Sequence, residues 1–128
     1  MVNERAKILI VDDDRILREV LAEYLADYFE VYVAANNRTA IHWLQSVDID
    51  VVITDIAHPD PNGLALTRLV KSFFEAKVII LSGALDSFYS REECHRAGAV
   101  LALRKPQQLS DILDFINKIL KKRAKEGM

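Results

Sequence analysis

The chain has 128 residues, of which 51% are hydrophobic and 28% are charged, and its formal net charge is −2. This is the size of one ordinary domain with a substantial core, and the composition argues against a disordered chain. The balanced charge gives no general attraction to nucleic acid, so we expect none to be bound by this domain alone. The single cysteine, Cys94, has no partner for an internal disulfide, and no apolar run is long enough for a signal peptide or a membrane span. We therefore expect a cytoplasmic protein without membrane contact.

The first half of the chain alternates between short apolar runs and amphipathic segments. Lys7–Val11 is almost wholly apolar and rich in β-branched residues, which predicts a strand covered on both faces. Apolar residues then recur at steps of three and four from Leu17 to Tyr28, which predicts a helix. The remaining elements of this half are, in order, a strand at Val31–Ala35, a helix through Ile41 and Leu44 with Asn36 or Asn37 as its cap, and a strand at Val51–Thr54.

The second half continues the alternation after a loop, where Pro59, Pro61 and Gly63 interrupt regular structure. The next elements are a helix marked by Leu66, Leu69, Val70 and Phe73 and a strand at Val78–Leu81. Residues Asp86–Ala97 are poorly amphipathic, and a helix is predicted there mainly because the alternation requires one, with Gly98 as its C-terminal stop. The last elements are a strand at Val100–Leu103 and a helix from Leu109 to Leu120, followed by basic residues.

Five strands that alternate with five helices predict a doubly wound α/β fold. Such strands form a parallel sheet with right-handed crossovers, and helices cover both of its faces. The sequence shows no internal repeat and no linker, so residues 1–128 are predicted to form a single domain, with a core from about residue 7 to 120 and a basic helix end at 121–128. In these sheets functional groups gather at the carboxyl ends of the strands.

Polar residues follow four of the five predicted strands. They are Asp12, Asp13 and Asp14 after the first strand, Asp55 after the third, Ser82 after the fourth and Lys105 after the fifth. Each has a simple structural explanation on its own, because an acid can cap a helix, a serine before glycine can form a turn, and a lysine can lie in solvent. Together they crowd several carboxylates at one rim, where repulsion is costly unless a cation binds. An all-oxygen cluster with room for water suits Mg²⁺.

Four motifs, KILIVDDD, VVITDIAHPDPNGL, IILSG and RKP, resemble in order and spacing those of response-regulator receiver domains in two-component signal transduction. The resemblance covers the chain from about Lys7 to Leu120 and is to the stand-alone, chemotaxis-regulator-like kind. It implies a flavodoxin-like (βα)5 sandwich whose five parallel strands lie in the order 2-1-3-4-5.

The resemblance implies catalytic roles for three residues. Asp55 would be the phosphoacceptor, whose carboxylate attacks a phosphohistidine or a small phosphodonor to form an aspartyl phosphate. Lys105 would pair with Asp55 before the reaction and with a phosphoryl oxygen afterwards. Ser82 would turn its hydroxyl to the phosphoryl group and so move the loop that follows it.

The resemblance also implies a metal site. Asp13, Asp55 and the backbone carbonyl of Ala57 would bind Mg²⁺ directly, and Asp12 would act through a water molecule. The metal would neutralise charge on the phosphoryl oxygens during transfer. Asp14 has no role in the family pattern, and we expect it to favour the start of a helix.

Partners follow from the same resemblance. A sensor histidine kinase or a histidine phosphotransfer protein would load Asp55, and the altered surface would change contacts with a downstream protein. The domain would act as a monomer or as a phosphorylation-dependent dimer. Turnover would be limited to Mg²⁺-assisted self-phosphorylation and slow self-hydrolysis, so we do not expect an enzyme in the ordinary sense.

Three positions depart from the family pattern. Ala102 stands where many receivers have a Tyr or Phe that moves inward with the hydroxyl, so the usual aromatic half of the switch is missing. Phe88 and Tyr89, just beyond the fourth strand, either substitute for it or serve only in packing. His58 replaces a large apolar residue in the loop after Asp55, where we expect an exposed histidine without function, and Gln107 occupies a place where an aromatic residue is common.

Three other interpretations stay open at this point. The same sequence fits a receiver that is a fragment of a larger regulator or hybrid kinase. A phosphorylation-independent interaction module with a receiver fold is favoured by Ala102 and disfavoured by the complete set of site residues. A phosphatase with an aspartyl intermediate needs a second acid beside the nucleophile, and Asp55-Ile56-Ala57 does not supply one.

Overall fold

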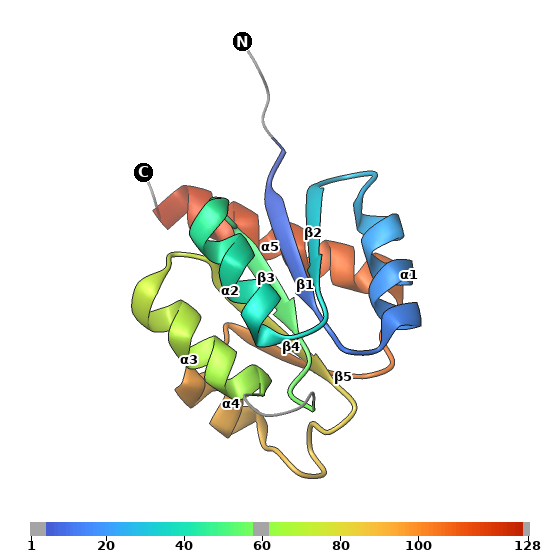
Figure 1. The fold of residues 1–128 in the computed structure, drawn as a ribbon, viewed down its shortest axis with the longest axis vertical. Helices are drawn as coiled ribbons and strands as arrows, with labels where there is room; N and C mark the ends of the chain where they lie inside the picture. The colour runs from blue at the N-terminus through green and yellow to red at the C-terminus, as the bar shows by residue number, and fades with distance from the viewer. Residues whose placement is uncertain (1–4, 58–61, 127–128) are drawn as a thin grey trace.

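A computed structural model describes residues 5–57 and 62–126 of the chain. Strands and helices alternate along it, as the sequence predicts (Figure 1). The elements are β1 (Lys7–Val11), α1 (Arg15–Leu25), β2 (Glu30–Ala34), α2 (Asn37–Ser46), β3 (Val51–Thr54), α3 (Gly63–Phe73), β4 (Lys77–Ser82), α4 (Arg91–Ala97), β5 (Leu101–Arg104) and α5 (Leu109–Glu126). Within these two ranges, no helix has both the length and the apolar character that crossing a membrane requires.

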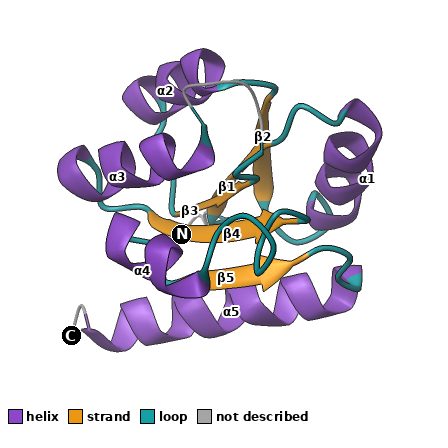
Figure 2. Ribbon diagram, turned by 90° about the horizontal axis from the view of Figure 1, so that it is seen from below, coloured by secondary structure: helices purple, strands orange, loops and turns teal. Residues whose placement is uncertain are grey.

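The strands form one parallel sheet in the order β2-β1-β3-β4-β5. Helices α1 and α5 cover one face, and α2, α3 and α4 cover the other (Figure 2). This arrangement confirms the predicted fold, a doubly wound flavodoxin-like sandwich with strand order 2-1-3-4-5. Because all strands run in one direction, their carboxyl ends meet at one edge of the sheet.

The central strand β1 shows how two cores hold this sheet. Ile8 and Ile10 pack with residues of α1 and α5, whereas Leu9 and Val11 pack with residues of α2, α3 and α4. All four side chains are at most 1% exposed. Burying an aliphatic side chain of this size contributes about 1.5–3 kcal/mol, which explains why an uninterrupted apolar run forms this strand.

Helix α1 has a narrower apolar face than the sequence predicts. It ends at Leu25, and its fully buried residues are Leu21 and Leu25, one turn apart. Val20 and Tyr28, which the spacing places on the same stripe, are 47% and 49% exposed. Phe29, just after the helix, is buried in their place. The prediction was wrong at Tyr28 because the helix ends at Leu25, and wrong at Val20 because the buried stripe of the helix is narrower than the spacing indicates.

Helix α4 is shorter than the predicted span 86–97. Its N-terminus is fixed by a capping box, in which Ser90 Oγ accepts from the Glu93 amide at 3.0 Å and the Ser90 amide donates to Glu93 Oε1 at 3.2 Å. Asp86 has a φ of +69°, which a helix does not accommodate. Gly98 ends the helix with a φ of +120°, which confirms the predicted stop.

Asp50 ties together the end of the sheet that lies opposite the strands' carboxyl ends. Its Oδ2 accepts from the Lys7 amide at 2.8 Å, and its backbone carbonyl accepts from the Lys77 amide at 3.0 Å. Its Oδ1 accepts from Arg123 Nη1 at 2.9 Å. A residue of the predicted basic helix end is therefore not merely solvated, because Arg123 fixes α5 to the base of the sheet.

Candidate functional site

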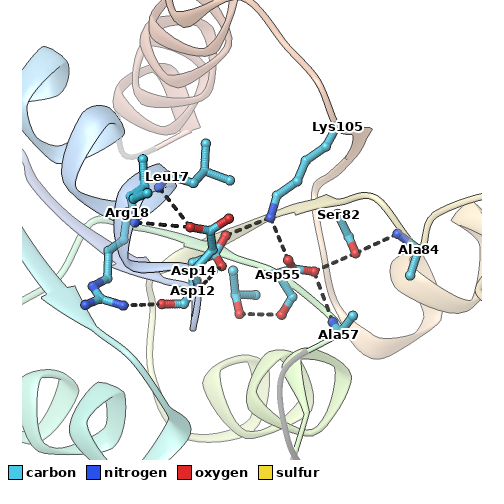
Figure 3. A network of polar contacts seen from close by, with 11 residues as sticks. Asp12, Asp14, Leu17, Arg18, Asp55, Ala57, Ser82, Ala84 and Lys105 are labelled. Carbon is cyan, nitrogen blue, oxygen red and sulfur yellow. Dashed lines mark hydrogen bonds and ion pairs between the residues drawn. The ribbon is translucent and has the colours of Figure 1, made fainter.

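Four polar side chains meet at the carboxyl ends of the strands (Figure 3). Asp12 follows β1, Asp55 follows β3, Ser82 ends β4 and Lys105 follows β5. Lys105 Nζ donates to Asp12 Oδ2 at 2.8 Å and to Asp55 Oδ2 at 2.6 Å. The sheet therefore brings these four residues together, as expected from its parallel topology, and one cation lies between two carboxylates.

Asp55 is the most extensively bonded group of the site. Its second oxygen, Oδ1, accepts from Ser82 Oγ at 2.6 Å and from the Ala57 amide at 3.0 Å. Ser82 Oγ in turn accepts from the Ala84 amide at 3.1 Å. Asp55 is only 8% exposed. Both carboxylate oxygens thus have donors, which offsets the unfavourable desolvation of a buried charge.

Asp55 and Lys105 each stabilise the ionised form of the other. Burial alone would raise the pKa of Asp55, but the hydrogen bonds from Lys105, Ser82 and the Ala57 amide, with the positive charge of Lys105, outweigh it and lower the pKa. Burial alone would lower the pKa of Lys105, but its bonds to Asp12 and Asp55 and their charges raise it. The carboxylate is therefore ionised and the amine is protonated at neutral pH.

Asp12 is held through both its side chain and its backbone. Its Oδ1 accepts from the Asp14 amide at 2.9 Å, and its backbone carbonyl accepts from Arg18 Nη1 at 2.7 Å. Asp12 is 5% exposed. The sequence reasoning missed Arg18, because its only signal is its position one turn into the helix that follows the aspartates.

Asp14 caps α1, in agreement with the predicted helix start. Its Oδ1 accepts from the Ile16 amide at 3.1 Å and from the Leu17 amide at 3.2 Å. Asp13, by contrast, is exposed to solvent. Among residues 5–57 and 62–126, no group of three His, Cys, Asp or Glu side chains is placed to hold a metal ion.

The chemistry of the site nevertheless suits a hard divalent cation. Asp12 and Asp55 contribute carboxylate oxygens, and both already contact the same ammonium group of Lys105. The two carboxylates share the ammonium group of Lys105, and Arg18 contacts only the backbone carbonyl of Asp12. Oxygen donors of this kind are those that Mg²⁺ prefers.

Gly63 allows the chain to turn back closely over Asp55. A Cβ at this position would overlap the carbonyl oxygen of Asp55 and would lie 2.9 Å from Ile56 Cα. Asn62 caps α3 by accepting from the amides of Leu64 and Ala65, both at 3.1 Å. Gly63 was predicted only as a loop residue, whereas the structure shows that it packs against the backbone of the site.

The three departures from the family pattern lie in different surroundings. Ala102 is 2% exposed and packs in the core, Phe88 is 83% exposed, and Tyr89 is partly buried against the core. Gln107 donates from its side chain to the Arg104 carbonyl at 2.9 Å. His58 lies outside the described residues, so its expected exposure stays a prediction.

The fold and this site together define a receiver domain. A family model of the response regulator receiver domain matches residues 8–117, and the chain belongs to this family. Over 115 residues it is 30% identical to the chemotaxis protein CheY of Halobacterium salinarum, which covers 89% of this chain and 96% of that protein. A solved structure of a CheY-like receiver domain protein from Methanospirillum hungatei has a TM-score of 0.86 and 27% identity, covering 96% of this chain and 99% of that one.

Other relatives are longer than this chain. The DNA-binding transcriptional regulator NtrC of Azospirillum brasilense is 33% identical over 116 residues, which are 90% of this chain and 24% of that protein. The chain spans 51% of the heme response regulator HssR of Staphylococcus saprophyticus. The domain thus resembles both single-domain chemotaxis proteins and one part of larger regulators.

Proposed function

We propose that Asp55 accepts a phosphoryl group in a cytoplasmic two-component phosphorelay. The donor is the phosphohistidine of a sensor histidine kinase or of a histidine phosphotransfer protein. The observation that carries the proposal is the buried Asp55 carboxylate, held between Lys105 and Ser82 and beside Asp12. This role is the same in a stand-alone protein and in a receiver that forms part of a longer regulator.

In the transfer step the carboxylate of Asp55 acts as the nucleophile. An Asp55 oxygen forms a bond to phosphorus, while the bond between phosphorus and the donor's imidazole nitrogen breaks and leaves its electron pair on that nitrogen. The lowered pKa of Asp55 keeps the carboxylate ionised for this attack. Lys105, which already contacts Asp55, pairs with a phosphoryl oxygen after the transfer.

Mg²⁺ is the cofactor that we propose for this step. Asp13, Asp55 and the backbone carbonyl of Ala57 would hold it directly, and Asp12 would hold it through a water molecule. When bound, it supplies neutralisation of the charge on the phosphoryl oxygens. The contacts of Asp12 and Asp55 with the Lys105 ammonium support a role for these two residues in the metal site, because both carboxylates already face the same positively charged group.

The output is a change of protein–protein contacts. Ser82 donates its hydroxyl to Asp55 in the unmodified domain and would donate it to the phosphoryl group once that group is present. The loop after β4 would follow, and the altered surface would bind a downstream protein. Hydrolysis by attack of water on phosphorus then releases inorganic phosphate and restores the carboxylate. Ile56 and Ala57 provide no acid beside Asp55, so we expect this hydrolysis to be slow.

Intact-protein mass after incubation with acetyl phosphate tests the proposal. We expect one phosphate to be added to the wild type only when Mg²⁺ is present, and none to be added to Asp55→Asn. Asp48→Asn is the matched control, because Asp48 is an exposed acid before β3, and it should be labelled like the wild type. Circular dichroism of Asp55→Asn should show an intact fold.

A second candidate function is an interaction module that works without phosphorylation. The buried Ala102 favours it, because the small side chain leaves no aromatic ring to move with Ser82. Absence of any added phosphate, both from acetyl phosphate and from a phosphorylated kinase, would replace the proposed function with this one.

A further inference from the structure

The segment between β4 and α4, residues 83–90, is anchored and sharply turned. Leu85 is completely buried, and the Asp86 amide donates to the Tyr89 carbonyl at 2.7 Å. Within the described ranges, Asp86 is the one residue other than glycine that has a positive φ, at +69°. A side chain is held in this uncommon backbone region only when its surroundings fix it. The segment therefore has a defined conformation.

Arg91, the first residue of α4, joins this segment to the edge strand β5. Its Nη2 donates to Asp86 Oδ2 at 3.2 Å, and its Nη1 donates to the backbone carbonyl of Ala102 at 2.8 Å. Ala102 itself has only a methyl group, which packs in the core. The planar guanidinium spans two acceptors that no other contact among the described residues joins, and lysine does not reproduce this geometry.

At its other end the same segment is held by Ser82. The Ser82 hydroxyl donates to Asp55 Oδ1 and accepts from the Ala84 amide, so both of these contacts share one oxygen (Figure 3). If the hydroxyl turns to another acceptor, the Ala84 amide must follow or lose its partner. Polar contacts thus lead from Asp55 through Ser82 into the segment that carries Asp86.

The ion pair between Arg91 and Asp86 is exposed enough to open. The side chains of Arg91 and Asp86 are 51% and 42% exposed, and an ion pair with this exposure is strongly screened by water. A contact that switches needs two arrangements of similar free energy, which a deeply buried pair would not allow. The bond to the Ala102 carbonyl is the second contact of Arg91, partly buried and shorter, and a change in this bond is what β5 would experience.

We propose that Arg91 couples the state of Asp55 to β5 in this chain. The inference rests on the proposed phosphorylation of Asp55 and adds a path for its effect. When the Ser82 hydroxyl turns to a phosphoryl oxygen, the segment shifts Asp86, the exposed ion pair between Asp86 and Arg91 opens, and the hydrogen bond from Arg91 to the Ala102 carbonyl changes with it. Arg91 thereby links the site to β5 through the backbone of Ala102, a role that the methyl side chain of Ala102 cannot fill.

Backbone amide NMR spectra of the full chain, recorded before and after phosphorylation by acetyl phosphate with Mg²⁺, test this path. The Leu103 amide belongs to the same peptide group as the Ala102 carbonyl and reports its hydrogen bond, while the Ala84 amide reports the segment. Arg91→Ala removes both contacts, and Asp86→Asn removes only the ion pair. Arg96→Ala is the matched control, because Arg96 lies on the same helix and pairs with an exposed acid at 3.3 Å.

In the wild type and in Arg96→Ala we expect phosphorylation to shift the resonances of both amides. In Arg91→Ala we expect the phosphorylated fraction and the Ala84 shift to be unchanged, and the Leu103 shift to fall below about a third of its wild-type size. Asp86→Asn should give an intermediate value. A full Leu103 shift in Arg91→Ala overturns the coupling, and so does a phosphorylated wild type without any Leu103 shift. A wild type that takes up no phosphate contradicts the proposed function itself and removes the basis of this inference.

Discussion

Replacing Lys105 with methionine removes the only cation shared by Asp12 and Asp55 among the described contacts. The methionine keeps an unbranched apolar stem of similar length, so packing changes little. The two carboxylates then face each other without compensation. We expect Lys105→Met to fold and to be less stable than the wild type at neutral pH in the absence of divalent cations.

The size of this effect follows from the geometry. Both carboxylate oxygens lie within 2.8 Å of one nitrogen, so they are at most about 5.6 Å apart, twice that distance. Two unit charges at this separation repel by about 3 kcal/mol at an effective dielectric constant near 20, and by about 0.7 kcal/mol in bulk water. The carboxylate side chains are 8% and 10% exposed, which places the site between these limits. We expect the free energy of unfolding to fall by about 2 kcal/mol.

Urea unfolding measured by circular dichroism provides the assay, with Lys7→Met as the matched control. The Lys7 side chain is 23% exposed, close to the 21% of Lys105, but it pairs at 3.7 Å with a single, half-exposed acid, Glu30. An exposed pair of this kind contributes about 0–1 kcal/mol. Mg²⁺ should restore much of the stability of Lys105→Met, because the proposed metal site exists in the folded protein and not in the unfolded chain.

The pH dependence of Lys105→Met gives a second measure of the same repulsion. Without Lys105, burial and the nearby Asp12 carboxylate raise the pKa of Asp55 above that of the unfolded chain, so stability should be regained as the pH falls from 7 towards 5. In the wild type the pKa of Asp55 is lowered, so this group adds no such gain in that interval. If Lys105→Met is as stable as Lys7→Met at neutral pH, or if its deficit persists on acidification, the electrostatic reasoning is wrong.

Three further predictions concern the frame of the site. Gly63→Ala should destabilise the fold by about 2 kcal/mol in urea unfolding, because its Cβ would overlap the Asp55 carbonyl. In the control Gly83→Ala the Cβ would meet nothing within 4 Å, so its stability should stay within about 0.5 kcal/mol of the wild type. Equal effects of the two substitutions would contradict the close packing at Gly63. In an acid titration, the wild type should lose the contribution of Asp55 as the pH falls below the ordinary value of 3.8, because the folded pKa is lowered, and Asp55→Asn should lack this loss. Asp14→Ala should lose about 1 kcal/mol in thermal unfolding and keep normal labelling by acetyl phosphate, because Asp14 caps α1; loss of labelling would mean that it belongs to the site.

Segments with one dominant pattern were predicted best. β1 and β3 have the predicted bounds, because both are buried on two faces and their apolar runs end at polar residues. The ends of α1 and α4 were less certain from pattern alone. Whether Tyr28 or Phe29 enters the core depends on where the chain leaves the helix. Aspartate tolerates a positive φ better than most residues, but most aspartates do not adopt one, so residue type alone does not single out Asp86.

Some residues of the site could be predicted from the sequence, and others could not. The meeting of Asp12, Asp55 and Lys105 follows from parallel topology, since each comes directly after a strand. Arg18 and Arg91 could not be found in this way, because both donate to backbone carbonyls. A backbone acceptor has the same chemistry at every position, so no pairing of residue types reveals such a contact before the fold is known.

The contacts of Asp50 bear on how this domain can be combined with others. Asp50 binds the amide of Lys7 at the start of β1 and the guanidinium of Arg123 near the end of α5. The first strand and the last helix thus begin and end at one pole of the molecule, away from the rim that carries Asp55 (Figure 1). A tag or a second domain fused at this pole would leave the reactive rim open, and the Arg123 contact would set the direction in which a fusion partner departs. The points of attachment and the reactive rim thus lie at opposite ends of the sheet.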